Sequence, residues 1–138
     1  MKSTKHITVL LAEDHQIVRE GLRKLLESEH DIEVVGEAND GVNAVELARQ
    51  LLPDVVVMDV TMPRMNGVEA TLRIVSEMPA VRVISLSMHN EIEIASAMAD
   101  AGATAYLSKS GPMESLLAAI RVGWPQKHNL DLPVRKHA

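Results

Sequence analysis

The feature that most constrains the fold of this 138-residue chain is a regular alternation of short apolar runs and longer amphipathic stretches. A short, uninterrupted apolar run is typical of a strand covered on both faces, whereas apolar residues three or four positions apart indicate a helix. Strands and helices that alternate in this way form βαβ units, which build a parallel sheet with helices on both faces. The sequence therefore predicts an α/β fold with a doubly wound, five-stranded parallel sheet.

Five apolar runs, most of them rich in β-branched residues, are predicted as strands. They are Ile7–Ala12, Ile32–Ala38, Asp54–Met58, Val81–Leu86 and Ala103–Leu107. Capping residues and prolines mark several ends of the five predicted helices. These are His15–Glu29, Asp40–Leu52, a helix through Val68, Leu72 and Val75 that Pro79 ends, a helix from Asn90 to Gly102, and one with Pro112 as its first residue. Met58, Met88 and Met98 are predicted to fill the core.

The alternation stops near the C-terminal end of the sequence. Residues 124–138 contain Pro125 and Pro133 and show little apolar periodicity. We therefore predict one domain over residues 1–123, followed by a linker stub or disordered tail over residues 124–138.

Composition excludes several classes of function. The chain has no cysteine, which rules out disulfides, thiolate metal sites and cysteine nucleophiles. Tyr106 and Trp124 are its only aromatic residues, too few for a base-stacking surface. The net charge of -5 argues against non-specific binding to nucleic acid or anionic membranes. No apolar run approaches the ~20 residues of a membrane span, so we expect a cytoplasmic protein with no membrane partner.

Polar residues follow four of the predicted strands, in the region where open parallel sheets bind ligands. Singly, each has an ordinary explanation, such as a helix cap or a solvated lysine. Their convergence at one edge of the sheet instead predicts a functional site. These residues are Glu13, Asp14, Asp59, Ser87 and Lys109.

The chemistry of this set points to phosphoryl transfer. Three close carboxylates repel one another, and a divalent cation with a preference for oxygen, Mg²⁺ or Mn²⁺ rather than zinc, would relieve that repulsion. Magnesium usually combines one or two carboxylates with a phosphate oxygen, and an aspartate can form an aspartyl phosphate. Lys109 would stabilise the charge of the transferring group, and Ser87 would donate a hydrogen bond to it.

Over residues 6–122 the sequence resembles the receiver domain of two-component response regulators. The motifs that carry the resemblance are the acidic pair in VLLAEDH, Asp59 in VVVMDVTMPRMNG with its spacing to Pro63 and Gly67, Ser87 in VISLSMH, and Lys109 in GATAYLSKS. The segments MHNE and GATAYLSK are most similar to the subfamily whose receivers are fused to a LuxR-type helix-turn-helix domain. The resemblance implies a flavodoxin-like sheet with strand order 2-1-3-4-5.

The resemblance also implies the roles of the site residues. Asp59 would accept a phosphoryl group from a histidine kinase in a reaction that depends on Mg²⁺ or Mn²⁺. Asp14 and Asp59 would be direct metal ligands together with the backbone carbonyl of Thr61, and Glu13 would act on the metal largely through water. Lys109 would bind the phosphoryl group.

Further residues would report or tune phosphorylation. Ser87 is implied as the switch hydroxyl and Tyr106 as the ring that follows it, although a lone tyrosine on a strand is often simply packed. Thr61 and His89 lie two positions after Asp59 and Ser87, where they would tune hydrolysis; His89 is equally explained as a surface residue. The face formed by residues 90–122 would then change and be read by the output, and phosphorylation would favour homodimers through helical faces.

On this interpretation the chain is not an enzyme with external turnover, because it catalyses only its own phosphorylation and dephosphorylation. Transcription would be controlled through a DNA-binding domain absent from these residues, and a stand-alone receiver stays open. Two alternatives remain: a receiver-fold binding module that works without phosphate, and an aspartyl-nucleophile phosphohydrolase, for which the second aspartate of a D-x-D motif is missing at Thr61. No role is assigned to His6, His15, His30, His128 or His137, which lack metal-ligand spacing.

Overall fold

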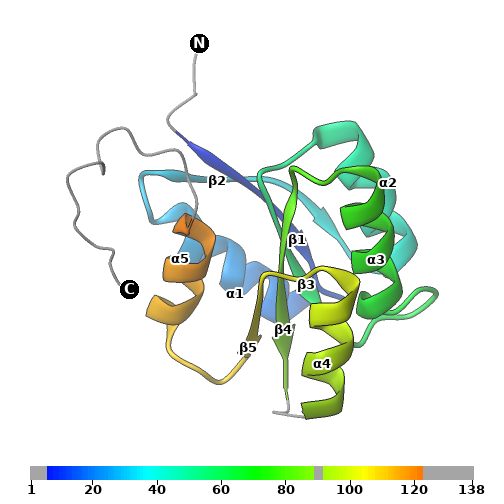
Figure 1. Ribbon diagram of the computed structural model, residues 1–138. Helices are drawn as coiled ribbons and strands as arrows, with labels where there is room; N and C mark the ends of the chain where they lie inside the picture. The colour runs from blue at the N-terminus through cyan, green and yellow to red at the C-terminus, as the bar shows by residue number, and fades with distance from the viewer. Residues whose placement is uncertain (1–5, 89–91, 123–138) are drawn as a thin grey trace, which may run out of the picture.

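The computed structural model describes residues 6–88 and 92–122. Five parallel strands form one sheet in the order β2-β1-β3-β4-β5, which confirms the predicted fold and strand order (Figure 1). The strands are β1 (Ile7–Ala12), β2 (Ile32–Ala38), β3 (Val55–Asp59), β4 (Arg82–Ser87) and β5 (Ala105–Ser108). The helices are α1 (Gln16–Glu27), α2 (Gly41–Leu51), α3 (Gly67–Glu77), α4 (Ile92–Ala101) and α5 (Met113–Arg121). None of these helices is long and apolar enough to cross a membrane.

Helices cover both faces of the sheet, with α1 and α5 on one face and α2, α3 and α4 on the other (Figure 1). Strand β1 shows how its side chains alternate between the two layers. Val9 and Leu11 belong to a buried cluster with residues of α1 and α5. Leu10 and Ala12 belong to the cluster that contains residues of α2, α3 and α4. Because both faces are covered, the strand needs apolar residues at successive positions, which explains its continuous apolar run.

Short polar side chains begin two of the helices. The carboxylate of Asp40 accepts a hydrogen bond from the Asn43 backbone N–H at 2.7 Å, which confirms the predicted cap of α2. The side chain of Asn66 accepts one from the Glu69 N–H at 2.9 Å and caps α3 in the same way. Each cap satisfies a backbone donor that lacks a partner within the helix.

Several details differ from the sequence predictions, including the bounds of β4 and β5, which were predicted as Val81–Leu86 and Ala103–Leu107. Pro112 is not the first residue of α5 but its N-cap, because its ψ of 142° is extended and the helix begins at Met113. Strand β3 ends at Asp59 rather than Met58, since its ladder with β4 continues to the Asp59–Leu86 pair. Met88 is 64% exposed rather than part of the core, because it follows the last residue of β4. The predicted Asn90 cap lies outside the described residues.

Two arginines hold the C-terminal end of α5 against the rest of the fold. The guanidinium of Arg82 donates hydrogen bonds to the carbonyls of Ala119 and Ile120 at 3.1 and 2.6 Å. These carbonyls belong to the last turn of the helix, where acceptors lack intrahelical donors. Arg121 donates to both carboxylate oxygens of Asp31 at 2.8 and 2.7 Å. The end of α5 is therefore tied to β4 and to the turn before β2.

We expect Asp31→Asn to destabilise the fold by about 1 kcal/mol at neutral pH, since it removes the charge that Arg121 binds. Hydrogen bonds from Arg121 lower the pKa of Asp31 below its usual 3.8. A carboxylate with a lowered folded-state pKa stabilises the protein above its unfolded pKa, and this contribution is lost as the pH falls through the folded-state pKa. The free energies of unfolding of the two proteins, measured in urea, should therefore become equal as the pH falls below about 3.8. A difference that did not change with pH, or an equal effect of Asp100→Asn at an exposed site on α4, would contradict this account.

Candidate functional site

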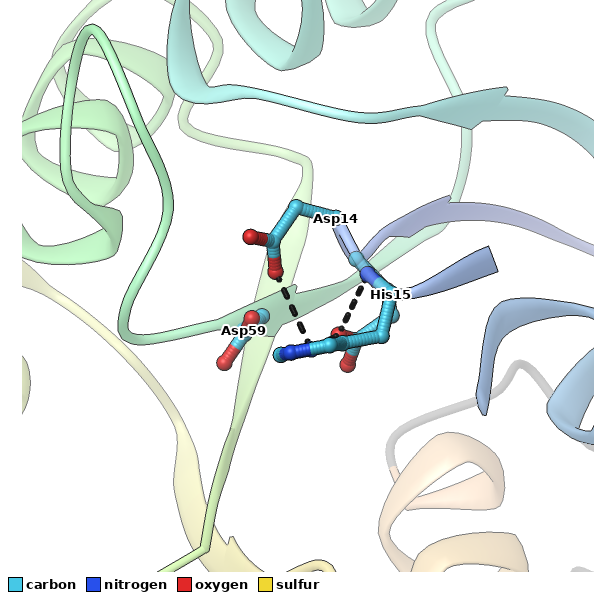
Figure 2. A group of neighbouring side chains, drawn as sticks. Asp14, His15 and Asp59 are labelled. Carbon is cyan, nitrogen blue, oxygen red and sulfur yellow. Dashed lines mark hydrogen bonds and ion pairs between the residues drawn. The ribbon is translucent and has the colours of Figure 1, made fainter. Parts of the chain in front are cut away.

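The polar residues predicted at the strand ends meet at one edge of the sheet. Strands β1 and β3 are neighbours, so the residues after Ala12 lie beside the end of β3 at Asp59. Strands β4 and β5 are also neighbours, and the Lys109 N–H donates to the Ser87 carbonyl at 2.8 Å. Figure 2 shows the side chains of Asp14 and Asp59 at this edge.

A buried lysine joins two of the carboxylates. The Nζ atom of Lys109 lies 2.8 Å from Oε1 of Glu13 and 3.3 Å from Oδ1 of Asp59. The exposed fractions of these side chains are 9% for Lys109, 2% for Glu13 and 4% for Asp59. Ion pairs this well shielded from water are much less screened than surface pairs. The ammonium therefore fixes the position of both carboxylates.

The remaining donor atoms fit a divalent cation. Oδ2 of Asp59 is buried and accepts no hydrogen bond from any described residue. One ligand atom from each of Glu13, Asp14, His15 and Asp59 lies within 4.8 Å of all the others. Three of these four donors are carboxylate oxygens, the ligands that Mg²⁺ prefers. The residues present therefore fit the predicted magnesium site.

The electrostatics of the site separate the roles of its charged groups. Burial raises the pKa of Asp59 to about 7, and the charge of Glu13 acts in the same direction. Burial also acts on Glu13, but hydrogen bonds from Lys109 and from His15 outweigh it and lower the pKa of Glu13. Burial likewise acts against the charge of Lys109, yet its hydrogen bond to Glu13 and its attraction to Asp59 raise the pKa of Lys109. Glu13 and Lys109 thus form an ionised pair, and Asp59 is the carboxylate that a further cation would stabilise.

The loop after β3 is fixed by contacts at several points. The Thr61 N–H donates to Oδ1 of Asp59 at 3.3 Å, so the loop turns back on the carboxylate. Arg64, in the left-handed region with φ 69°, donates through Nε to Oδ2 of Asp40 at 3.0 Å. A Cβ atom built on Gly67 would lie 2.4 Å from the Asp59 carbonyl oxygen. The start of α3 therefore packs directly on the backbone of Asp59.

We expect Gly67→Ala to destabilise the protein by about 1–3 kcal/mol, because the added methyl group would force backbone atoms apart. The shift would reach Asp59, which the glycine contacts. Chemical denaturation measures the stability, and Gly21→Ala in α1, where no atom lies within 4 Å, is the matched control. Equal stabilities of Gly67→Ala and the parent would show that the close approach is not a constraint.

The structure places the predicted switch residues next to this site and beside α4. Ser87 is buried at the end of β4. Tyr106, on β5, is partly buried and packs on the same buried cluster as Ile94 of α4. His89 lies outside the described residues. The structure thus gives the positions of Ser87 and Tyr106, and their roles in switching stay predictions.

His15 is the site residue that the sequence analysis missed. Its Nδ1 atom lies 3.0 Å from Oε2 of Glu13 and 3.3 Å from Oδ1 of Asp14 (Figure 2). Its backbone N–H also donates to Oε2 of Glu13 at 3.1 Å. The expectation that His15 lacks metal-ligand spacing to carboxylates was wrong, because the chain turns after β1 and brings adjacent side chains together. Its position directly after an acidic pair at a strand end was the available signal.

Comparisons with known proteins identify the family of this chain. The family model described as the response regulator receiver domain matches residues 9–121. The chain belongs to the response regulator receiver family. It is 40% identical over 116 residues to the transcriptional regulatory protein DegU of Brevibacillus brevis, an alignment that covers 84% of this chain and 49% of DegU. It is 43% identical over 115 residues to the response regulator UvrY of Escherichia coli K12, covering 83% of this chain and 53% of UvrY.

A solved structure supports the same family. The crystal structure of a LuxR-family two-component response regulator from Aurantimonas sp. SI85-9A1 matches this receiver with a TM-score of 0.80 and 40% identity, over 84% of this chain and 83% of that one. The predicted family and LuxR-type subfamily are thereby confirmed. The receiver spans about half the length of the curated relatives it matches.

Proposed function

We propose that this receiver accepts a phosphoryl group on Asp59 from the phosphohistidine of a histidine kinase. The proposal rests on the groups that surround the Asp59 carboxylate. One of its oxygens lies 3.3 Å from the ammonium of Lys109, and the other is buried and accepts no hydrogen bond from the residues that the structure describes. A buried carboxylate held in this way by a cationic group is suited to act as a nucleophile toward phosphorus.

In the proposed reaction, a carboxylate oxygen of Asp59 forms a bond to phosphorus while the bond from phosphorus to the kinase imidazole nitrogen breaks. The imidazole leaves with the electron pair of that bond. Lys109 stabilises negative charge on the phosphoryl oxygens, and Ser87 donates a hydrogen bond to one of them.

A cation would assist this reaction. Asp14, Asp59 and the backbone carbonyl of Thr61 would hold Mg²⁺ or Mn²⁺, with Glu13 acting largely through water. When bound, the ion neutralises charge on the carboxylates and the phosphoryl group. Hydrolysis of the aspartyl phosphate, tuned by Thr61 and His89, would return the protein to its starting state without turnover of an external substrate.

We propose that phosphorylation is read by the face of residues 90–122. The new charge beside Ser87 and Lys109 would bias two arrangements of Ser87 and Tyr106, and α4 would transmit the change because Tyr106 packs on the same cluster as Ile94. DegU is named a transcriptional regulatory protein, which supports control of transcription through a DNA-binding domain outside these residues. The domain boundary at residue 123 stays a prediction.

We expect one added phosphoryl group in the intact mass after incubation with Mg²⁺ and acetyl phosphate. Asp59→Asn should abolish the addition because the amide is a poor nucleophile, while its similar shape keeps the fold. A chelator should also abolish it. Labelling retained in Asp59→Asn would place the acceptor elsewhere. No labelling of the folded parent protein would instead favour a receiver that binds partners without phosphate.

We also expect phosphorylation to favour homodimers through helical faces. Apolar side chains available for such contacts include Ile17 on α1 and Ile92 on α4, each 85% exposed. Light scattering with and without beryllofluoride, a phosphoryl mimic, measures the change in mass, and Asp59→Asn serves as the control. A single unchanged species in both conditions would contradict this expectation.

A further inference from the structure

The imidazole of His15 adds a nitrogen donor to a site whose other side-chain donors are carboxylate oxygens. Its Nδ1 atom is 3.0 Å from Oε2 of Glu13 and 3.3 Å from Oδ1 of Asp14. In Figure 2 the His15 ring lies beside the carboxylates of Asp14 and Asp59. The side chain of His15 is 67% exposed, so it can adjust its position without disturbing the core.

A second observation shows that this group is suited to a cation. Asp59 is only 4% exposed, and its Oδ2 atom lacks a hydrogen-bond donor among the described residues. A buried carboxylate oxygen without a donor is costly unless a positive group approaches it. The donors of Glu13, Asp14, His15 and Asp59 lie within 4.8 Å of one another, close to the separation that one shared ion requires.

The nitrogen ligand of His15 raises the affinity of the site for some metal ions more than for others. Magnesium prefers oxygen ligands and retains water, so an imidazole adds little to its binding. Cobalt, nickel, copper and zinc bind imidazole nitrogen readily, and their affinity for mixed nitrogen and oxygen sites is generally higher than that of harder ions. A neutral imidazole can present the Nδ1 lone pair to the ion while Nε2 carries the proton.

We propose that His15 acts through Nδ1 as a ligand, with Glu13, Asp14 and Asp59, for a borderline divalent cation such as Co²⁺ or Zn²⁺, in competition with Mg²⁺. This proposal rests on the proposed function only because both use the same metal site. Zinc sites with four protein ligands are closed, whereas a reactive site keeps a position open. Zn²⁺ bound in this way therefore inhibits phosphorylation of Asp59 rather than supporting it.

The test is a Co²⁺ titration of the untagged protein, followed by visible absorption, whose d–d bands change with the ligands and geometry of the ion. His15→Gln is the informative variant, because its amide oxygen still suits a hard cation. His30→Gln, at an exposed position before β2 and at the opposite edge of the sheet, is the matched control. We expect His15→Gln to weaken Co²⁺ binding at least about tenfold and His30→Gln to leave it unchanged. Mg²⁺ affinity, measured by NMR chemical shifts, should change less than about twofold in both variants.

Three results would overturn the proposal. They are no Co²⁺ binding to the parent protein, the same Co²⁺ affinity and spectrum in His15→Gln, and an equal loss of Mg²⁺ and Co²⁺ affinity in His15→Gln. Thermal unfolding of the metal-free variants verifies that each is folded. Labelling with acetyl phosphate in Mg²⁺ is measured in parallel, since its failure would contradict the proposed function without affecting the Co²⁺ result.

Discussion

The balance of charge at the carboxyl edge of the sheet is the constraint on which the site depends. Glu13, Asp14 and Asp59 converge there, and Lys109 supplies an ammonium that is in ion-pair contact with two of them. One positive charge does not neutralise three carboxylates, and burial of Asp59 makes the excess costly, as its raised pKa shows. The fold therefore places excess negative charge where a bound cation would be stabilised, which is also where the proposed phosphoryl group would attach.

The rest of the structure holds these groups in place. Apolar side chains of β1 and β3 are buried between two layers of helices, so the acidic residues at the strand ends have a rigid base. The loop after Asp59 is held by the pair of Arg64 and Asp40 and by the packing of Gly67 on the Asp59 carbonyl. Preorganisation of this kind lets charged groups act without first reorganising the backbone.

Most of the fold and site followed from local sequence patterns, whereas contacts made by side chains across loops did not. Continuous apolar runs such as Ile7–Ala12 identify buried parallel strands, and the residues at their ends identify the site edge. The position of His15 depends on a turn that no periodicity describes. The Arg121–Asp31 pair joins residues 90 positions apart, and Arg64 adopts a positive φ that its residue type does not favour. These features depend on tertiary geometry, to which hydrophobic patterns are insensitive.

The carboxylate of Asp59 has two proposed roles, as nucleophile and as metal ligand. The identity of the bound metal ion would therefore affect phosphorylation. Asp59 is the proposed nucleophile and also one of the four donors within reach of a single ion. An ion that leaves coordination positions open can attract phosphoryl oxygens toward Asp59, whereas an ion surrounded by protein ligands occupies the same space without doing so. In the proposed metal site the residue that changes ion preference is the solvent-exposed imidazole of His15 beside Glu13 and Asp14, which would add a nitrogen ligand without altering the core. The proposed chemistry thus requires an open oxygen-rich site, and under the proposed metal ligation His15 is the residue that works against it.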